Sequence, residues 1–170
     1  MKVFLIGYMG SGKSKTAETL AKLLKFQWVD IDSQIQIKEG RSISQIFETS
    51  GQEYFREIEK KTLHEINSSE NIVVSTGGGM PCYFDNMEWM NNNGLTVYLE
   101  ANAGLLFHRL ASMREGRPLI EKLNDVELME QILSHLIHRI PFYKKAKLVV
   151  GAANINVKLL AEKITEFKKK

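Results

Sequence analysis

The sequence predicts a three-layer α/β fold in which a five-stranded parallel sheet lies between helices on both faces. Short apolar segments alternate along the chain with segments whose apolar residues recur at helical spacing, a pattern typical of a parallel sheet that is buried on both sides. The chain of 170 residues is 44% hydrophobic and 25% charged, which suits a compact domain with a sizeable core. It has no internal repeat and no Pro/Gly/Ser-rich linker, so residues 1–170 are expected to form a single domain.

Each predicted strand is a short apolar run, and each predicted helix is longer and amphipathic. The strands are residues 2–6, 27–29, 72–74, 96–99 and 147–150. The helices are residues 14–25, 33–39, 43–50, 52–67, 84–92, 102–112, 125–140 and 155–168. Ligands of such folds bind beyond the carboxyl ends of the strands, so the residues that follow each strand are the first candidates for a site.

A glycine-rich loop follows the first predicted strand. Residues 7–14 read Gly-Tyr-Met-Gly-Ser-Gly-Lys-Ser and match the pattern G-x-x-x-x-G-K-S/T in full, the signature of a loop whose backbone N–H groups cradle phosphates. The helix that begins near Ser14 directs its positive end at the same anion. Lys13 is expected to reach the β- and γ-phosphates of a nucleotide, and Ser14 to bind magnesium. The alternative is a simple glycine-rich turn beside a lysine, and the motif alone does not distinguish a kinase from a switch or a motor.

Two aspartates stand at the end of the second predicted strand. Asp30 and Asp32 are two residues apart, so on a strand their side chains would point the same way, beside the phosphate loop. One carboxylate could hold water on magnesium, while the other orients and deprotonates an attacking hydroxyl. The alternative is that Asp32 only caps the helix that follows.

Three glycines follow the third predicted strand, at positions 77–79. Consecutive glycines cost backbone entropy, so their presence here suggests that the backbone approaches a ligand closely, although a strained turn is the alternative.

Three arginines are candidates for binding anions. Arg56 lies on the helix 52–67, Arg117 lies in a loop with Gly116, and Arg139 lies at the end of the helix 125–140. Arginines bind planar carboxylates in bidentate fashion, and one on a mobile loop can close over phosphate. A solvated surface position is the alternative for each, and Arg139 could also act as a cation at a helix C-terminus.

Composition excludes several classes of protein. The 23 basic and 20 acidic residues give a net charge of only +3, and no nucleic-acid recognition motif is present, so a nucleic-acid partner is not expected. No apolar run approaches the roughly 20 residues that span a bilayer. The single cysteine, Cys82, excludes an internal disulfide and suits a cytoplasmic location. Without an obvious apolar stripe, we expect a monomer.

Taken together, these features resemble the shikimate kinase family over nearly the whole chain. The matching motifs are G-x-M-G-S-G-K-S at 7–14, D-x-D at 30–32, G-R-S-I-x-x-I-F at 40–47, G-x-x-x-F-R-x-x-E at 51–59, S-x-G-G-G at 75–79, G-R-P-L at 116–119 and R-x-P-x-Y at 139–143. The resemblance implies a P-loop kinase fold like that of nucleoside monophosphate kinases, with a substrate-binding helical region at 31–62 and a mobile lid at about 112–122. It also implies transfer of the ATP γ-phosphate to the 3-hydroxyl of shikimate, on the route to chorismate and aromatic amino acids, with one Mg²⁺ per subunit.

The resemblance also implies a role for each matching residue. Catalysis would fall to Lys13, Asp32 as the base, and Arg117 from the lid. ATP would be bound by Gly10, Ser11, Gly12, Lys13, Ser14, Lys15 and Arg117. Shikimate would be bound by Asp32, by the backbone at Gly77, Gly78 and Gly79, and by a carboxylate clamp of Arg56 and Arg139. Magnesium would be held by Ser14 and, through water, by Asp30.

The chain departs from the family pattern at two places. Lys15 stands where many members have a second hydroxyl residue, and the stretch 151–156 lacks the arginine that packs on adenine in some members. Two other functions remain open from the sequence: a kinase for another small hydroxylated acid such as gluconate, and a nucleotide-binding regulator that has lost phosphoryl transfer.

Overall fold

The parallel sheet predicted from the sequence is the centre of the fold. The computed structural model describes residues 1–66, 71–113, 120 and 122–168. Within these ranges, a five-stranded sheet has the order β2-β3-β1-β4-β5, and every neighbouring pair is parallel. The strands are β1 (Lys2–Ile6), β2 (Gln27–Asp30), β3 (Ile72–Ser75), β4 (Leu95–Glu100) and β5 (Leu148–Gly151). Because β1 is central, the loop that follows it opens at the middle of the sheet's carboxyl edge.

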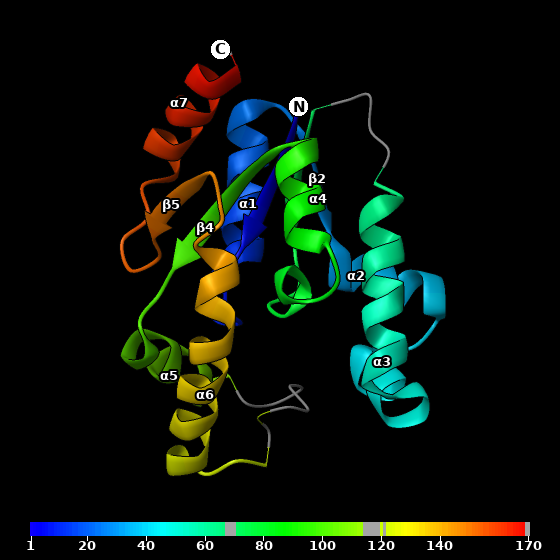
Figure 1. Ribbon diagram of the computed structural model, residues 1–170. Coiled ribbons are helices and arrows are strands. Elements are labelled where there is room, and N and C mark those ends of the chain that lie inside the picture. The colour runs from blue at the N-terminus through cyan, green and yellow to red at the C-terminus, as the bar shows by residue number, and fades with distance from the viewer. Residues whose placement is uncertain (67–70, 114–119, 121, 169–170) are drawn as a thin grey trace.

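Helices connect the strands and cover both faces of the sheet (Figure 1). They are α1 (Lys13–Leu24), α2 (Ile31–Glu39), α3 (Ile43–His64), α4 (Asn86–Asn93), α5 (Ala103–Ala111), α6 (Asp125–Tyr143) and α7 (Val157–Lys168), with a short 3-10 helix at Met80–Cys82. The three-layer α/β architecture predicted from the alternating pattern is therefore confirmed.

Two hydrophobic clusters form, one on each face of the sheet. Alternate residues of β1 enter different clusters: Val3 and Leu5 pack on one face, and Phe4 and Ile6 on the other. The first cluster takes residues from α1, α5, α6 and α7, and the second takes residues from α2, α3 and α4. Since side chains alternate along a strand, a β1 that is apolar throughout requires cover on both sides.

The helix α6 runs farther than expected. The sequence predicts that it ends at residue 140, but the structure continues it through Pro141 to Tyr143. A proline lacks the N–H that would bond one turn back, so α6 runs through Pro141 with that hydrogen bond missing. Arg139 therefore lies inside the helix and not at its C-terminus, so its interpretation as a terminal cation is wrong. Tyr143 lies one turn farther along the same side of α6.

The break predicted at Gly51 is present inside α3. Gly51 has φ 81° and ψ 175°, which is not helical, so two helical pieces meet there at a kink. A positive φ of this kind is accessible to glycine at little cost.

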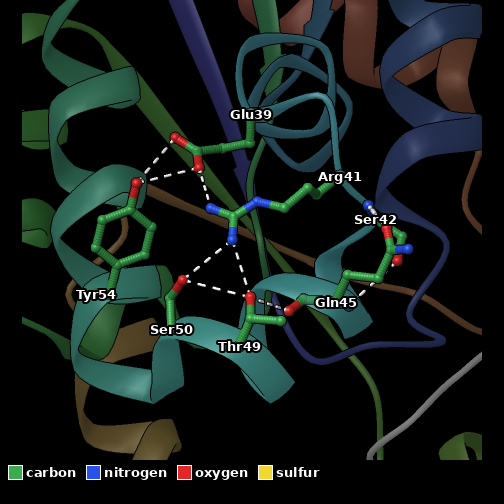
Figure 2. A network of polar contacts seen from close by, with 7 residues as sticks. All are labelled: Glu39, Arg41, Ser42, Gln45, Thr49, Ser50 and Tyr54. Atoms are coloured by element: carbon green, nitrogen blue, oxygen red, sulfur yellow. Dashed lines mark hydrogen bonds and ion pairs between the residues drawn. The ribbon is translucent and has the colours of Figure 1, made fainter.

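A polar network holds the corner between α2 and α3 (Figure 2). Arg41 donates to Thr49 and Ser50 from one guanidinium nitrogen and pairs with Glu39 through another. The hydroxyl of Tyr54 donates to the same Glu39 carboxylate. The network joins residues on both sides of Gly40 and of Gly51, so it fixes the direction in which α3 leaves the corner.

Apolar side chains also lie on the outside of α6. Val126 is 67% exposed, Leu133 is 47% exposed and Ile137 is 72% exposed, and their spacing places them along one side of the helix. The sequence pattern does not separate these residues from the buried Leu128, Ile132 and Leu136. The expectation that no apolar stripe is exposed is therefore wrong, and the monomer stays a prediction.

No helix among the described residues is both long and apolar enough to cross a bilayer. Most of the lid predicted at about 112–122, including Arg117, lies outside the described residues.

Candidate active site

A cavity of about 960 Å³ opens at the carboxyl edge of the sheet. Its walls come from the loop after β1, the start of α1, the end of β2, the loop after β3 and the loop after β5. Among the predicted site residues, the lining includes Gly10, Ser11, Gly12, Lys13, Ser14, Lys15, Asp30, Asp32 and Gly78. The cavity thus lies where the rule for parallel sheets predicts it, beyond the carboxyl ends of the strands.

The phosphate loop adopts a backbone that depends on its glycines. Gly7, Gly10 and Gly12 have φ values of 144°, 80° and 93°, a region that other residues rarely adopt. A Cβ on Gly7 would lie 2.8 Å from the Leu99 carbonyl oxygen. The Lys13 ammonium donates to the Tyr8 carbonyl at 2.9 Å, and the Ser11 N–H donates to the same oxygen at 3.1 Å. These contacts close the loop around the start of α1, where its N–H groups can receive an anion.

Arg109 on α5 is a residue of this site that the sequence did not reveal. Its guanidinium donates to the carbonyls of Gly10 and Ser11 at 3.1 and 3.2 Å, and to the Ala152 carbonyl at 3.0 Å. It therefore ties the phosphate loop to the loop after β5, across sequence separations of 43 and 99 residues. No local motif marks such a contact, because its partners are backbone atoms that carry no sequence signal.

Ser14 and Asp30 lie side by side at the start of α1. The Ser14 hydroxyl donates to Asp30 Oδ2 at 2.9 Å and lies 3.2 Å from the Ser75 hydroxyl. Asp30 also accepts the Ser33 N–H through Oδ1, so Asp30 and not Asp32 is the N-cap of α2. The capping role considered for Asp32 is therefore wrong.

Asp32 occupies the first turn of α2. The expectation that both aspartates lie on one strand is wrong, since β2 ends at Asp30 and the helix begins at Ile31. The turn nevertheless keeps both residues in the wall of the cavity, while Ile31 is fully buried.

The carboxyl of Asp32 is unusually basic. Burial and the neighbouring charge of Asp30 raise its pKa to about 6, although Lys13 and Arg56 act in the opposite direction. Its Oδ1 atom is buried and accepts no hydrogen bond from the described residues. A buried oxygen with unused acceptor capacity, a raised pKa and a position beside a phosphate loop has the properties of a general base.

Arg56 is buried and paired, contrary to the alternative of a solvated surface arginine. Its side chain forms an ion pair with Glu59 one turn along α3, and only 1% of the Glu59 side chain is exposed. Burial raises the pKa of Glu59 to about 7, and the Arg56 charge opposes that rise. The guanidinium also lies over the Tyr83 ring, 4.3 Å from the ring centre. The sequence contains Glu59 in the motif at 51–59 but assigns it no role.

Arg139 approaches the same place from α6. A Cβ on Gly78 would lie 3.6 Å from its Nη1 atom, and Tyr143 donates its hydroxyl to the Gly78 carbonyl. A Cβ on the next residue, Gly79, would meet the Arg56 guanidinium in the same way, so the two guanidinium groups lie against adjacent positions of the backbone. Burial raises the pKa of the Cys82 thiol to about 11, so a reactive thiolate is not expected.

The three glycines after β3 make room for these side chains. None of them has a positive φ, so the alternative of a strained turn is wrong. A Cβ on Gly77 would lie 2.5 Å from Glu59 Oε1 and 3.0 Å from Asp32 Oδ1. A Cβ on Gly79 would lie 2.9 Å from both terminal nitrogens of Arg56. Each glycine therefore permits a close approach that a larger residue would block.

This packing leads to a prediction for Gly79→Ala. The added methyl group should displace the Arg56 guanidinium, which cannot move freely because Glu59 holds it. If Arg56 binds the acceptor, the acceptor KM should rise about 10-fold while the ATP KM stays unchanged. Steady-state kinetics with both substrates measure this. Gly104→Ala is a matched control, because its Cβ would meet only Asn102 Oδ1 at an ordinary 3.6 Å. Equal effects of the two substitutions would contradict the prediction.

Comparisons with known proteins agree with the motifs. The shikimate kinase family model matches residues 9–169. A shikimate kinase of Phocaeicola vulgatus is 44% identical over 146 residues, which are 86% of this chain and 83% of that protein. The crystal structure of shikimate kinase from Bacteroides thetaiotaomicron superposes with a TM-score of 0.91 at 35% identity, covering 100% of this chain and 99% of that one.

A structure with bound acceptor is also similar. Shikimate kinase from Acinetobacter baumannii in complex with shikimate has a TM-score of 0.84 and 31% identity, over 99% of this chain and 92% of that chain. The family match spans the phosphate loop from Met9 onward, both aspartates, the glycine triplet, Arg56 and Arg139. The chain therefore belongs to the shikimate kinase family.

Proposed function

We propose that this protein transfers the γ-phosphate of ATP to the 3-hydroxyl of shikimate, giving shikimate 3-phosphate and ADP. The observation that carries the proposal is the meeting of Asp32, Arg56 and Arg139 around the glycine triplet, beside the phosphate loop. Shikimate is a small carboxylate with three hydroxyls. A pair of arginines suits its carboxylate, and an ionisable carboxyl suits its hydroxyls.

The phosphates of ATP would lie against the loop 7–14. Its N–H groups and the positive end of α1 would bind the phosphate oxygens. Lys13 is 8% exposed and already held by the Tyr8 carbonyl, so little side-chain freedom is lost when it meets the γ-phosphate. Lys15 lines the same cavity from the first turn of α1.

The residues at the start of α1 fit one magnesium ion. Ser14 and Asp30 present oxygen atoms 2.9 Å apart, and magnesium prefers oxygen ligands while keeping several waters. Ser14 would bind the ion directly, and Asp30 would hold it through water. When bound with ATP, magnesium neutralises part of the phosphate charge that develops during transfer.

The transfer itself needs a general base and a cation that stabilises the charge on the phosphates. Asp32 would accept the proton of the 3-hydroxyl as that oxygen bonds to the γ-phosphorus and the bond to the β-phosphate oxygen breaks. With a pKa of about 6, Asp32 is still mostly ionised at neutral pH, and it is more basic than an ordinary aspartate, so it can take the proton. Lys13 would stabilise the charge on the transferring group and on ADP.

Arg56, from the substrate-binding helical region at 31–62, and Arg139 would hold the shikimate carboxylate. The backbone of Gly77, Gly78 and Gly79 would lie against the ring. Arg117 would join the ATP phosphates from the lid, which excludes water and so limits ATP hydrolysis. Since ATP is a cytoplasmic metabolite, we place the enzyme in the cytoplasm, and we retain the monomer as a proposal.

The test is a coupled assay of ADP release with ATP and magnesium. Shikimate, gluconate and no acceptor are compared, and the product is identified by mass and by the position of its phosphate. We expect turnover with shikimate alone and phosphate on the 3-oxygen. Turnover with gluconate alone, or none with either acceptor from protein that binds ATP, would overturn the proposal in favour of another acceptor or a regulator.

A further inference from the structure

We propose that Tyr8 and His135 form a positioning pair for Arg139 and hold it against the phosphate loop. The inference rests on the proposed role of Arg139 as a carboxylate ligand. Both residues contact the Arg139 side chain directly, so the pair would act through Arg139 and not on the acceptor itself.

The three side chains contact one another between β1 and α6. The Tyr8 hydroxyl lies 2.9 Å from His135 Nδ1. The same nitrogen lies 3.4 Å from Arg139 Nη2, one helical turn away on α6. The Arg139 guanidinium also lies over the Tyr8 ring, 5.2 Å from the ring centre. Arg139 is therefore held on one side by His135 Nδ1 and on another by the face of the Tyr8 ring.

The hydrogen-bonding roles follow from the chemistry of the groups. Arginine only donates, so His135 Nδ1 must accept, and its proton must lie on Nε2. Nδ1 has a single lone pair, so the Tyr8 hydroxyl at 2.9 Å is its main donor, and Arg139 Nη2 at 3.4 Å shares that lone pair in a longer three-centre contact. Burial raises the Tyr8 pKa to about 12, which keeps this hydroxyl protonated. Burial and the charges of Arg139 and His138 lower the pKa of His135, which favours the neutral ring that this arrangement requires.

Tyr8 also belongs to the phosphate loop. Its carbonyl accepts from the Lys13 ammonium at 2.9 Å and from the Ser11 N–H at 3.1 Å. Its ring is buried, with 2% exposed. The Tyr8 backbone therefore contacts Lys13, which is proposed to bind the phosphates. The Tyr8 side chain contacts Arg139, which is proposed to bind the acceptor.

The glycine triplet adds a second connection between the two sites. A Cβ on Gly78 would lie 3.2 Å from the Met9 nitrogen and 3.6 Å from Arg139 Nη1, so the phosphate loop, Gly78 and Arg139 form a continuous packed contact. Positions of reacting groups must be held within a fraction of an ångström. By orienting Arg139, the Tyr8–His135 pair would help to fix the position at which Arg139 receives the acceptor carboxylate.

The experiment compares His135→Leu with His135→Asn. Leucine removes the acceptor atom, whereas the side-chain oxygen of asparagine can occupy the place of Nδ1. Loss of one positioning hydrogen bond should raise the shikimate KM about 5-fold and change kcat less than about 2-fold. The ATP KM should stay constant, and His135→Asn should restore most of the shikimate KM. His108→Leu, an exposed histidine on α5, is the matched control.

Tyr8→Phe supplies a second, independent variant. It keeps the ring under Arg139 and removes only the hydroxyl, so it should raise the shikimate KM in the same direction. The double variant Tyr8→Phe/His135→Leu should be no worse than His135→Leu alone, because both changes break one contact chain. Additive effects would overturn the pairing. Thermal unfolding curves check that each variant is folded.

Each failure has its own readout. If wild-type protein does not turn over shikimate, the proposed function fails. If Arg139→Ala leaves the shikimate KM unchanged, the role of Arg139 fails, and the positioning pair fails with it. Suppose that wild-type protein phosphorylates shikimate and that Arg139→Ala raises the shikimate KM. If His135→Leu and His135→Asn then behave alike, or raise the KM values of shikimate and ATP together, only the positioning pair is overturned.

Discussion

Replacing Asp32 with asparagine should lower kcat by about 10²- to 10⁴-fold, the usual contribution of a positioned general base. Asparagine keeps the size of the side chain but cannot accept the proton of the 3-hydroxyl. ATP binding should stay nearly intact, because the contacts that close the phosphate loop come from Tyr8, Ser11 and Lys13. Turnover by the coupled assay and ATP binding by calorimetry measure the two effects separately.

The same substitution should increase stability above about pH 6. Burial raises the pKa of Asp32 from 3.8 to about 6, so the folded protein holds this proton more tightly than the unfolded chain does. The resulting stabilisation is present below pH 3.8 and is lost as the pH rises through 6. At pH 8 the ionised Asp32 therefore destabilises the fold, and Asp32→Asn should have a higher Tm than wild type. The difference should disappear near pH 4.

Asp85→Asn is a suitable control for both measurements. Its carboxylate is 56% exposed and pairs with Lys60 at 2.7 Å, away from the cavity, so it should alter neither kcat nor ATP binding and should not raise Tm at pH 8. The pH profile gives a further check, since wild-type kcat/KM for shikimate should fall as Asp32 is protonated below about pH 6. Unchanged turnover in Asp32→Asn would remove Asp32 from the mechanism.

The parts of the fold and site that the sequence predicts well are those specified by local pattern. The phosphate loop is one continuous segment whose glycines have the positive φ values that the motif requires. The five strands are apolar runs between helical segments, so their existence and order along the chain follow from periodicity. Gly51 interrupts α3 between the two helices predicted at 43–50 and 52–67.

The remaining features depend on contacts between distant segments. Arg109 binds carbonyls 43 and 99 residues away, and His135 meets a tyrosine 127 residues away. A single sequence carries no periodic signal for such pairs. From the sequence, the helix is predicted to end just before Pro141. In the structure it continues for one more turn, because the buried Tyr143 packs between β4 and Gly78. Tertiary burial here overrides the local preference.

The glycine triplet shows a different limit of sequence reasoning. The sequence indicates that the backbone at 77–79 is approached closely, and the structure supplies the reason as close contacts of four side chains. Those contacts involve Asp32, Glu59, Arg56 and Arg139 from three helices. The presence of the glycines was therefore informative, but the identity of their neighbours required the fold.

The second large effect is expected for Arg139→Ala. Removing one partner of a charged, desolvated hydrogen-bonded pair costs about 2–5 kcal/mol, which corresponds to a rise of about 30- to 4,000-fold in the shikimate KM. The ATP KM should change less than about 3-fold. Arg139→Lys should recover only part of the loss, because an ammonium cannot bind a carboxylate in bidentate fashion.

A spectroscopic readout separates the geometry of Arg139 from its role in catalysis. The Arg139 charge lowers the pKa of His135, so Arg139→Ala should raise that pKa toward 6.5, as followed by NMR of the histidine ring. Lys145→Ala, an exposed cation just beyond α6, should leave both the His135 pKa and the shikimate KM unchanged. A raised His135 pKa with equal increases in both KM values would confirm the contact but contradict the carboxylate clamp, since a clamp acts on the acceptor alone.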